Sequence, residues 1–407
     1  MEAQWLQEKI DQLATFSETK TGVTRLAFSS WDEKSQAFFI REMEQVGLTV
    51  RKDAAGNLIG RLEGTDVAAT VVATGSHLDS VPQGGKYDGV VGVVGGLLAV
   101  KRLKAKGPLT HPVELIVFAA EESSRFSYST IGSKAMTGSM QIRAWKKAVD
   151  REGVSLVQAL MNRGLDFDQF SHAVRSRDDF KCFIELHIEQ GYLLERGQEV
   201  IGIVEAIAAP TRLKITVAGE AAHSGTTPMD GRHDALVSAA KIVLAVRDIA
   251  MEQTHLGTVG TVGVLNVQPG SMNVIPGNVE MWVDIRGVQQ ESIIDSIQEL
   301  KDFVSTLAEE EETPAAIDVL ASDRPVILDE VLADQIETIC KRRKISYRRM
   351  NSGAGHDAMN MAKITPTGMI FIPCKNGVSH NPAESAKIED ILTGVDVLTQ
   401  ILFDQAK

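Results

Sequence analysis

The sequence has few cysteines and no long apolar stretch. Its three cysteines, Cys182, Cys340 and Cys374, are odd in number and widely separated, which argues against a disulfide framework and suits a reducing compartment. No stretch approaches eighteen consecutive apolar residues, and residues 1–13 lack the apolar core of a signal peptide. We therefore expect a cytoplasmic protein that does not enter a membrane.

An excess of positive charge is also missing. The net charge is −12 at pH 7, which argues against nucleic acid and against anionic membrane surfaces as partners. The glycine-rich segment 89–100 does not contain GxGxxG, so a dinucleotide-binding interpretation fails at its motif. The charge does not exclude small polar molecules as partners. At 407 residues the chain is too long for one compact core, and we expect two domains.

The sequence does contain four short apolar runs, each followed by residues that bind metals well. The runs span residues 70–76, 111–120, 182–186 and 369–374. Such runs are typical of strands buried on both faces in an α/β domain, whose ligands lie beyond the carboxyl ends of the strands. We expect one site formed by four segments, with the residues His77, Glu121, Glu122, His187 and His380.

The pattern changes near residue 211, where apolar and polar residues begin to alternate as in a half-buried strand. The elements that follow, up to residue 320, have the predicted order β-α-β-β-α-β, which is the ferredoxin-like arrangement. The fold class is therefore α/β: a catalytic domain, residues 1–210 and 322–407, with a mainly parallel mixed sheet flanked by helices, and an inserted domain, residues 211–321. Near the N-terminus, Ser30 to Glu33 is predicted to be the capping box of a helix that Gly47 ends.

Two carboxylates near His77 fit a metal site. Asp79 follows that histidine by two residues, as a group that orients the imidazole ring must, although an isolated HxD pattern is more often structural. Asp88 lies in a glycine-rich loop where the backbone can approach an ion closely, and its two oxygens can bridge two metals.

The adjacent Glu121 and Glu122 are more informative. Two neighbouring carboxylates at the end of an apolar strand repel each other unless a cation compensates them, although the pair could also be an ordinary helix N-terminus. One can bind a metal while the other serves as a general base toward water. With Asp88 shared, three ligands are available for each of two metals, and open positions are left for water and substrate: His77, Asp88, Glu122, His187 and His380.

These residues stand within a longer series of motifs that resembles the hydantoinase/carbamoylase-type amidases. This family includes N-carbamoyl-L-amino acid hydrolases, allantoate amidohydrolases and β-ureidopropionases, and it is related to the dinuclear-zinc aminopeptidase-like exopeptidases. The motifs are Gly75-Ser-His-Leu-Asp79, Tyr87-Asp-Gly89, Glu121-Glu122-Ser-Ser-Arg-Phe126, Glu185-Leu-His-Ile-Glu-Gln-Gly191, His223-Ser-Gly225, Met272-Asn-Val-Ile-Pro276, Asp284-Ile-Arg286 and Ser379-His380.

The resemblance implies that His77 and His187 hold one metal and that Glu122 and His380 hold the other, with Asp88 as the bridge. Two divalent ions per subunit are expected, zinc or manganese, with cobalt or nickel as alternatives. The peptidase relatives usually carry an acidic residue at the position of His187. The resemblance also implies a homodimer built through the inserted domain, which would serve as a lid.

Further roles also follow from the resemblance. Glu121 is the general base, Asp79 orients His77, and His223 stabilises the oxyanion. A small ureido carboxylate substrate would contact five residues: Gln190, Arg212, Asn273, Arg286 and His356.

The expected reaction is metal-dependent hydrolysis of the carbamoyl C–N bond of an N-carbamoyl-L-amino acid. Allantoate is the alternative substrate, and β-ureidopropionate or a dipeptide is less favoured. A metal-binding protein without catalysis is disfavoured because Glu121 is present. A purely structural dimer would not need these ligand residues at strand ends.

Overall fold

The computed structural model describes residues 1–407, and the chain divides into two compact units. Unit 1 comprises Met1–Glu205, Leu328–Ser352 and His356–Lys407, and unit 2 comprises Ala206–Ile327 with Gly353–Gly355. These divisions lie near the domain boundaries expected at residues 210/211 and 321/322. Unit 2 is thus an insertion in the sequence of unit 1.

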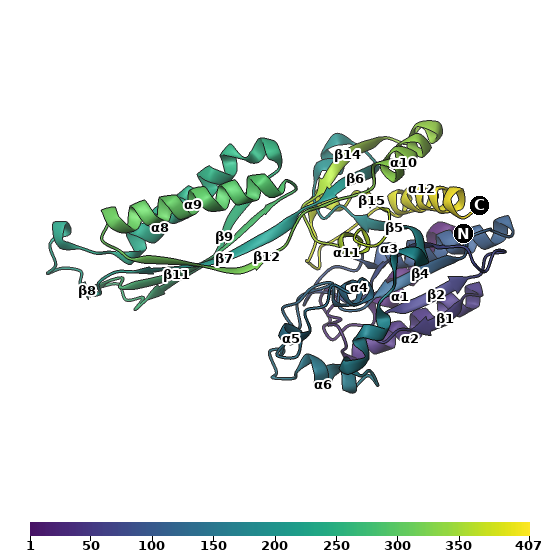
Figure 1. Ribbon diagram of the computed structural model, residues 1–407, viewed down its shortest axis with the longest axis horizontal. Coiled ribbons are helices and arrows are strands. Elements are labelled where there is room, and N and C mark those ends of the chain that lie inside the picture. The colour runs from purple at the N-terminus through teal and green to yellow at the C-terminus, as the bar shows by residue number, and fades with distance from the viewer. The chain divides into compact units, whose positions relative to one another are not determined.

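The main sheet is mixed and has nine strands, in the order β1-β2-β4-β3-β5-β15-β6-β13, with β14 paired to β6 (Figure 1). It forms the centre of unit 1, except that β13 and the end of β6 with which it pairs fall within unit 2. The four central strands, β4, β3, β5 and β15, are parallel, whereas β2 and β6 run antiparallel to their central neighbours. The strands are β1 Thr49–Lys52, β2 Leu58–Leu62, β3 Val71–His77, β4 Val113–Phe118, β5 Phe180–Ile188, β6 Ile201–Ile207, β13 Val326–Ile327, β14 Tyr347–Ser352 and β15 Thr367–Ile372.

Helices flank this sheet, which confirms the mixed α/β fold predicted for the catalytic part. α3 and α12 pack on the central strands, and α1 packs on both of these helices. Their apolar side chains form the main core with alternate residues of β4 and β5. The helices are α1 Glu2–Ala14, α2 Ser30–Val46, α3 Val90–Lys106, α4 Ile131–Met136, α5 Ile142–Trp145, α6 Leu156–Met161, α7 Leu193–Gly197, α10 Glu330–Arg343, α11 Ala358–Met361 and α12 Ile388–Ala406, with 3-10 turns η1 Phe167–Ala173, η2 Arg177–Asp179 and η5 Lys375–Gly377.

The helix α2 begins one residue earlier than the sequence suggested. The capping residue is Ser29, whose side chain accepts a hydrogen bond from the backbone N–H of Asp32, and Ser30 is already helical. The prediction of a cap at Ser30 was therefore wrong by one position, because two adjacent serines offer the same cap chemistry. As predicted, Gly47 ends the helix, and the structure places it in the left-handed region with a φ of 86°.

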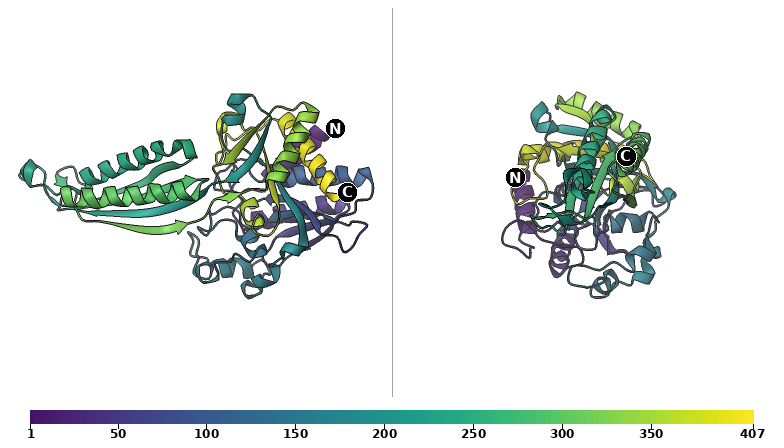
Figure 2. Two further views of the ribbon diagram at one scale, coloured as in Figure 1. Left: turned by 45° about the horizontal axis from the view of Figure 1, so that its top comes forward. Right: turned by 90° about the vertical axis from the view of Figure 1, so that its left-hand side faces the viewer.

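Unit 2 contains a four-stranded antiparallel sheet in the order β12-β7-β11-β9. Its long elements follow one another as strand, helix, strand, strand, helix, strand: β7 Ala209–Ala218, α8 Ala235–Glu252, β9 Val259–Gln268, β11 Asn278–Gly287, α9 Gln290–Glu310 and β12 Ala315–Ser322. Both helices lie along one face of the sheet (Figure 2). A two-stranded ribbon, β8 Ala222–His223 with β10 Val274–Ile275, and the turns η3 Met229–Gly231 and η4 Thr254–Leu256 complete the unit.

None of the helices has the length and apolar character that a membrane span requires.

Candidate metal centre

Two histidines reach the site from neighbouring parallel strands. β3 and β5 pair directly, β3 ends at His77, and His187 is the penultimate residue of β5. Leu186 and Ile188 point into the main apolar core that the sheet forms with α3 and α12. His187 lies between them in the strand and therefore points to the opposite face of the sheet. Strand pairing thus fixes both rings at one sheet edge.

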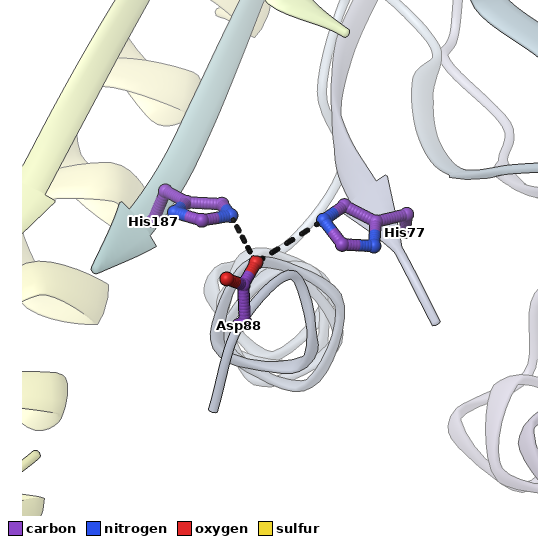
Figure 3. A group of neighbouring side chains, drawn as sticks. All are labelled: His77, Asp88 and His187. Atoms are coloured by element: carbon purple, nitrogen blue, oxygen red, sulfur yellow. Dashed lines mark ion pairs between the residues drawn. The ribbon is translucent and has the colours of Figure 1, made fainter. Parts of the chain in front are cut away.

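The two rings converge on one oxygen of Asp88, which lies just before α3 (Figure 3). The Nε2 atom of His77 lies 3.4 Å from Asp88 Oδ1, and that of His187 lies 3.2 Å from it. All three side chains are buried. His77 Nδ1 lies 2.9 Å from the carbonyl oxygen of Asp79, and His187 Nδ1 lies 2.9 Å from that of Ile188. Each Nδ1 therefore carries a proton, so in the neutral rings each Nε2 has the lone pair that a metal ligand needs. The lone pair of His187 accepts the backbone N–H of Gly89 at 3.1 Å.

A second set of ligands meets the other oxygen of Asp88. His380 Nε2 lies 3.3 Å from Asp88 Oδ2 and 3.3 Å from Glu122 Oε1. The side chain of His380 is 48% exposed, whereas those of Asp88 and Glu122 are largely buried. Asp88 thus faces one set with each oxygen, which is the geometry that a bridging carboxylate requires.

The donor atoms fit a pair of divalent cations. In each of the sets His77–Asp88–His187 and Asp88–Glu122–His380, the ligand atoms lie within 4.8 Å of one another. Imidazole and carboxylate donors suit zinc, and they also suit manganese, cobalt and nickel. The sequence prediction had grouped the same five residues.

The carboxylates and imidazoles of the centre shift one another's pKa values. Burial alone would raise the pKa of Asp88, but the hydrogen bonds with His187, His380 and His77 hold it well below the usual range. Burial would lower the pKa of His77, whereas the neighbouring carboxylates Glu121, Asp88 and Asp79 raise it well above 6.5. Asp88 and Glu122 raise the pKa of His380 to about 10. The carboxylates therefore favour positive charge at this position.

Asp79 contacts His77 in a way the sequence did not indicate. Its carboxylate oxygen Oδ1 lies 3.8 Å from His77 Nδ1, too far for a hydrogen bond, and the ring donates to the backbone carbonyl of Asp79 instead. The carboxylate accepts the backbone N–H groups of Glu121 at 3.1 Å and Glu122 at 3.0 Å. The predicted carboxylate–imidazole contact is thus replaced, and the carboxylate orients the glutamate pair.

Glu121 lies beside the cation ligands without joining either ligand set. Its side chain is buried, and its Oε2 atom lies 3.8 Å from His77 Nε2. Burial raises the pKa of Glu121 well above its usual range, and the charges of Glu122, Asp357 and Asp79 act in the same direction. A carboxyl group with a raised pKa can accept a proton from water and donate it again near neutral pH.

The predicted substrate residues of unit 1 have other partners. Gln190 donates its side-chain N–H to Asp88 Oδ2 at 2.7 Å, so it holds the shared carboxylate. His356 is buried, lies 2.9 Å from the Ser352 hydroxyl and places its ring centroid 4.6 Å from that of His187. Burial, together with the neighbouring His187, lowers the pKa of His356 well below 6.5. A neutral His356 thus packs against a cation ligand.

The predicted residues of unit 2 form two groups within that unit. Arg286 donates Nε and Nη2 to the two carboxylate oxygens of Asp284, at 2.7 and 3.0 Å, and Arg212 lies 3.3 Å from the same carboxylate. His223 is exposed and pairs with Val274, next to Asn273. Its Nδ1 accepts the N–H of Gly225 at 3.0 Å, so Nε2 carries the proton of the neutral ring.

Two buried acids beneath the centre were not foreseen. Glu185 accepts hydrogen bonds from the Ser76 hydroxyl at 2.8 Å and the Ala358 N–H at 3.0 Å. Asp357 accepts from the Ser133 hydroxyl at 2.5 Å. The two-residue spacing of Glu185 and His187 on one strand was the available signal, because it places both side chains on the same face.

Comparison with known proteins shows extensive similarity. Residues 73–404 match the family described as peptidase family M20/M25/M40. Over 388 residues the chain is 40% identical to the N-carbamoyl-L-amino acid amidohydrolase of Geobacillus stearothermophilus, covering 95% of this chain and 94% of the relative. It is 38% identical to the ureidoglycolate hydrolase of Oryza sativa, covering 97% and 82%. It is 36% identical to the allantoate amidohydrolase of Escherichia coli, covering 99% and 98%.

A solved structure agrees with these relatives. A hydantoinase/carbamoylase family amidase from Burkholderia multivorans superposes with a TM-score of 0.91 at 32% identity, covering 99% of this chain and 98% of that one.

Proposed function

The chain belongs to peptidase family M20/M25/M40, and on that premise we propose that it hydrolyses the carbamoyl C–N bond of an N-carbamoyl-L-amino acid. The resemblance to hydantoinase/carbamoylase amidases drawn from the motifs is confirmed, and the protein is a metal-dependent amidohydrolase that acts on C–N bonds. The choice among ureido substrates and the roles of single residues belong to the proposal.

One observation carries the proposed chemistry. Asp88 faces two ligand sets with separate oxygens, while the carboxyl group of Glu121 stands next to His77 outside both sets. Separate ligands and a separate proton acceptor are what metal-assisted hydrolysis needs. A site for cation storage would need no buried carboxyl group of raised pKa beside its ligands.

His77, Asp88 and His187 would hold one cation, and Asp88, Glu122 and His380 the other. When bound, the pair supplies a Lewis acid for the ureido carbonyl and lowers the pKa of water.

Glu121 then performs the proton transfers. It removes one proton from the attacking water as the new C–O bond forms at the ureido carbon. It delivers that proton to the amino-acid nitrogen as the C–N bond breaks. The products are the free amino acid and carbamate, and carbamate decomposes to ammonia and carbon dioxide. Asp79 holds the backbone N–H groups of Glu121 and Glu122, which fixes the base relative to the adjacent ligand.

Residues of unit 2 complete the proposal. The Nε2–H of His223 is a free donor for the oxyanion, because its Nδ1 is occupied by Gly225. Arg286 and Arg212, with Asn273, would bind the substrate carboxylate, and Asp284 holds both guanidinium groups in place before substrate binds. Gln190 would reach the substrate from its position on Asp88. His356 is better assigned to supporting His187 than to contacting substrate.

We also propose that unit 2 is a ferredoxin-like lid and the dimerisation domain. The strand order β12-β7-β11-β9, with both helices on one face of the sheet, supports the ferredoxin-like fold. Apolar side chains exposed on the edge strand β9, Val264 and Leu265, support the role in dimerisation. The oligomeric state in solution, measured by sedimentation, tests this part.

Allantoate is the second candidate substrate. The relatives named for allantoate and for ureidoglycolate cover 99% and 97% of the chain at 36% and 38% identity, against 95% at 40% identity for the N-carbamoyl-L-amino acid amidohydrolase of Geobacillus stearothermophilus. β-Ureidopropionate and dipeptides are disfavoured, the dipeptides because His187 stands where the related peptidases usually carry an acid.

The test is ammonia release by protein loaded with zinc or manganese, from N-carbamoyl-L-amino acids, allantoate, ureidoglycolate, β-ureidopropionate and simple dipeptides. We expect ammonia together with a free L-amino acid from the first group, and ammonia release slowed by about 10²–10⁴-fold after Glu121→Gln. Preferred turnover of allantoate or ureidoglycolate would replace the substrate but keep the ureido chemistry. Amino acids released from dipeptides alone would contradict the ureido proposal.

A further inference from the structure

Glu384 is a buried carboxylate to which the proposed chemistry gives no task. It is 4% exposed and lies in the segment between His380 and α12. Burying a carboxylate is costly unless hydrogen bonds compensate it. Its partners therefore indicate what the group does.

Each oxygen of Glu384 binds a different ligand-bearing loop. Oε1 accepts the backbone N–H of Tyr87 at 2.9 Å and that of Asp88 at 3.1 Å. Oε2 lies 2.9 Å from the hydroxyl of Ser379, the residue directly before His380. That hydroxyl also lies 2.9 Å from Asp88 Oδ2. One side chain thus joins the backbone of Asp88, its carboxylate and the loop of His380.

The loop that contains Gly85 leaves space for the carboxylate of Glu384 because this residue has no side chain. A Cβ atom added to Gly85 would lie 2.0 Å from Glu384 Oε1, so no other residue fits there while Glu384 keeps its position. His380 itself has a φ of 54°, in the left-handed region that disfavours side chains. Such a conformation persists only where its surroundings hold it.

We propose that Glu384 is a positioning residue that fixes Asp88 and His380 relative to each other, so that the second cation position is formed before a cation arrives. It acts through hydrogen bonds and touches neither cation nor substrate. The inference rests on the metal centre of the proposed function and adds a residue that the ligand sets do not contain.

Two substitutions of Glu384 separate the effect of its hydrogen bonds from the effect of its charge. In Glu384→Gln, the amide oxygen can still accept the two backbone N–H groups, and the amide nitrogen can donate to the Ser379 hydroxyl, which then donates to Asp88. Glu384→Ala removes all of these bonds. Gly85→Ala leaves Glu384 in the chain but displaces it.

The experiment is calorimetric titration of the metal-free full-length protein with Zn²⁺ and, separately, Mn²⁺, with thermal unfolding as a check on folding. We expect two binding equivalents in the original protein. Glu384→Ala and Gly85→Ala should weaken one equivalent by about 10–100-fold, the usual effect of removing an outer partner of a metal ligand. Glu384→Gln should bind as the original does. Glu389→Ala, an exposed acid five residues on, and Gly231→Ala, where a Cβ meets nothing within 4 Å, are the matched controls.

Unchanged affinity for both equivalents in folded Glu384→Ala overturns the inference. Equal losses in Glu384→Gln and Glu384→Ala also overturn it, because the charge and not the hydrogen-bond pattern would then matter. If Glu384→Ala does not fold, Gly85→Ala provides the test. Weaker binding of one equivalent in this variant would support the inference, and unchanged affinity would overturn it. Absence of cation binding by the original protein would instead contradict the proposed metal centre itself.

Discussion

The two cation positions share Asp88 but differ in how the fold supports them. His77 and His187 are 2% and 1% exposed, lie on neighbouring strands of the central sheet, and each donates Nδ1–H to a backbone carbonyl. His380 is 48% exposed in its side chain and lies in a loop at positive φ. The first position is part of the folded core, whereas the second depends on loop contacts. Affinity and stability should therefore respond differently to changes at the two positions.

Replacing Asp88 by Ala should have the largest effect, because it removes the one ligand that both positions share. We expect both cations to be lost and ureido hydrolysis to disappear. Metal analysis of the purified variant checks this, with Asp404→Ala on the exposed side of α12 as the control. One tightly retained cation would mean that the two positions do not depend on Asp88 equally.

Replacing His187 and His380 singly by Ala should separate the two positions. Each variant should lose one cation. In the metal-free protein, His187→Ala should also destabilise the fold, by about 1–3 kcal/mol, since the buried Gly89 N–H and Ile188 carbonyl lose their partner. His380→Ala should cause a smaller loss of stability, because solvent screens the ion pairs of this half-exposed ring. Similar loss of stability in both variants would contradict the distinction between core and loop.

Glu121→Gln should leave both positions occupied and lower kcat by about 10²–10⁴-fold, the usual contribution of a general base. The amide keeps the shape of the side chain but accepts no proton from water. Kinetics and metal content of the same sample are the measurement. Retained turnover would show that Glu121 is not the general base.

The smallest expected effect is on pH dependence. Asp88 and Glu122 raise the pKa of His380 to about 10 from 6.5. In the metal-free protein, the charged ring therefore contributes stability in full below pH 6.5, and this contribution is lost as the pH rises through about 10. The stability difference between the original protein and His380→Ala should shrink between pH 7 and pH 10.5 in chemical denaturation. A difference that grows with pH would have the wrong sign.

The sequence was sufficient to group the five residues of the two candidate ligand sets, and the reason is local. Each follows an apolar run or lies in a glycine-rich loop, and parallel strands present their ends at one edge. The order of elements in residues 211–321 was equally readable from the period of apolar residues.

Contacts between distant segments could not be read in this way. Glu384 meets Asp88 across almost 300 residues of sequence, and Asp357 meets Ser133 across more than 200. The partner of His77 was assigned to the right residue but the wrong atom, because the spacing in HxD does not distinguish the carboxylate of Asp79 from its carbonyl. The pairing of Arg286 with Asp284 follows from two side chains on one face of β11 and was open to prediction.

The most direct test is anomalous diffraction from crystals of zinc-loaded protein, recorded on both sides of the zinc absorption edge. Two peaks are expected, one among His77, Asp88 and His187 and the other among Asp88, Glu122 and His380. A single peak, or peaks that do not share Asp88, would contradict the two-cation centre on which the proposed function depends.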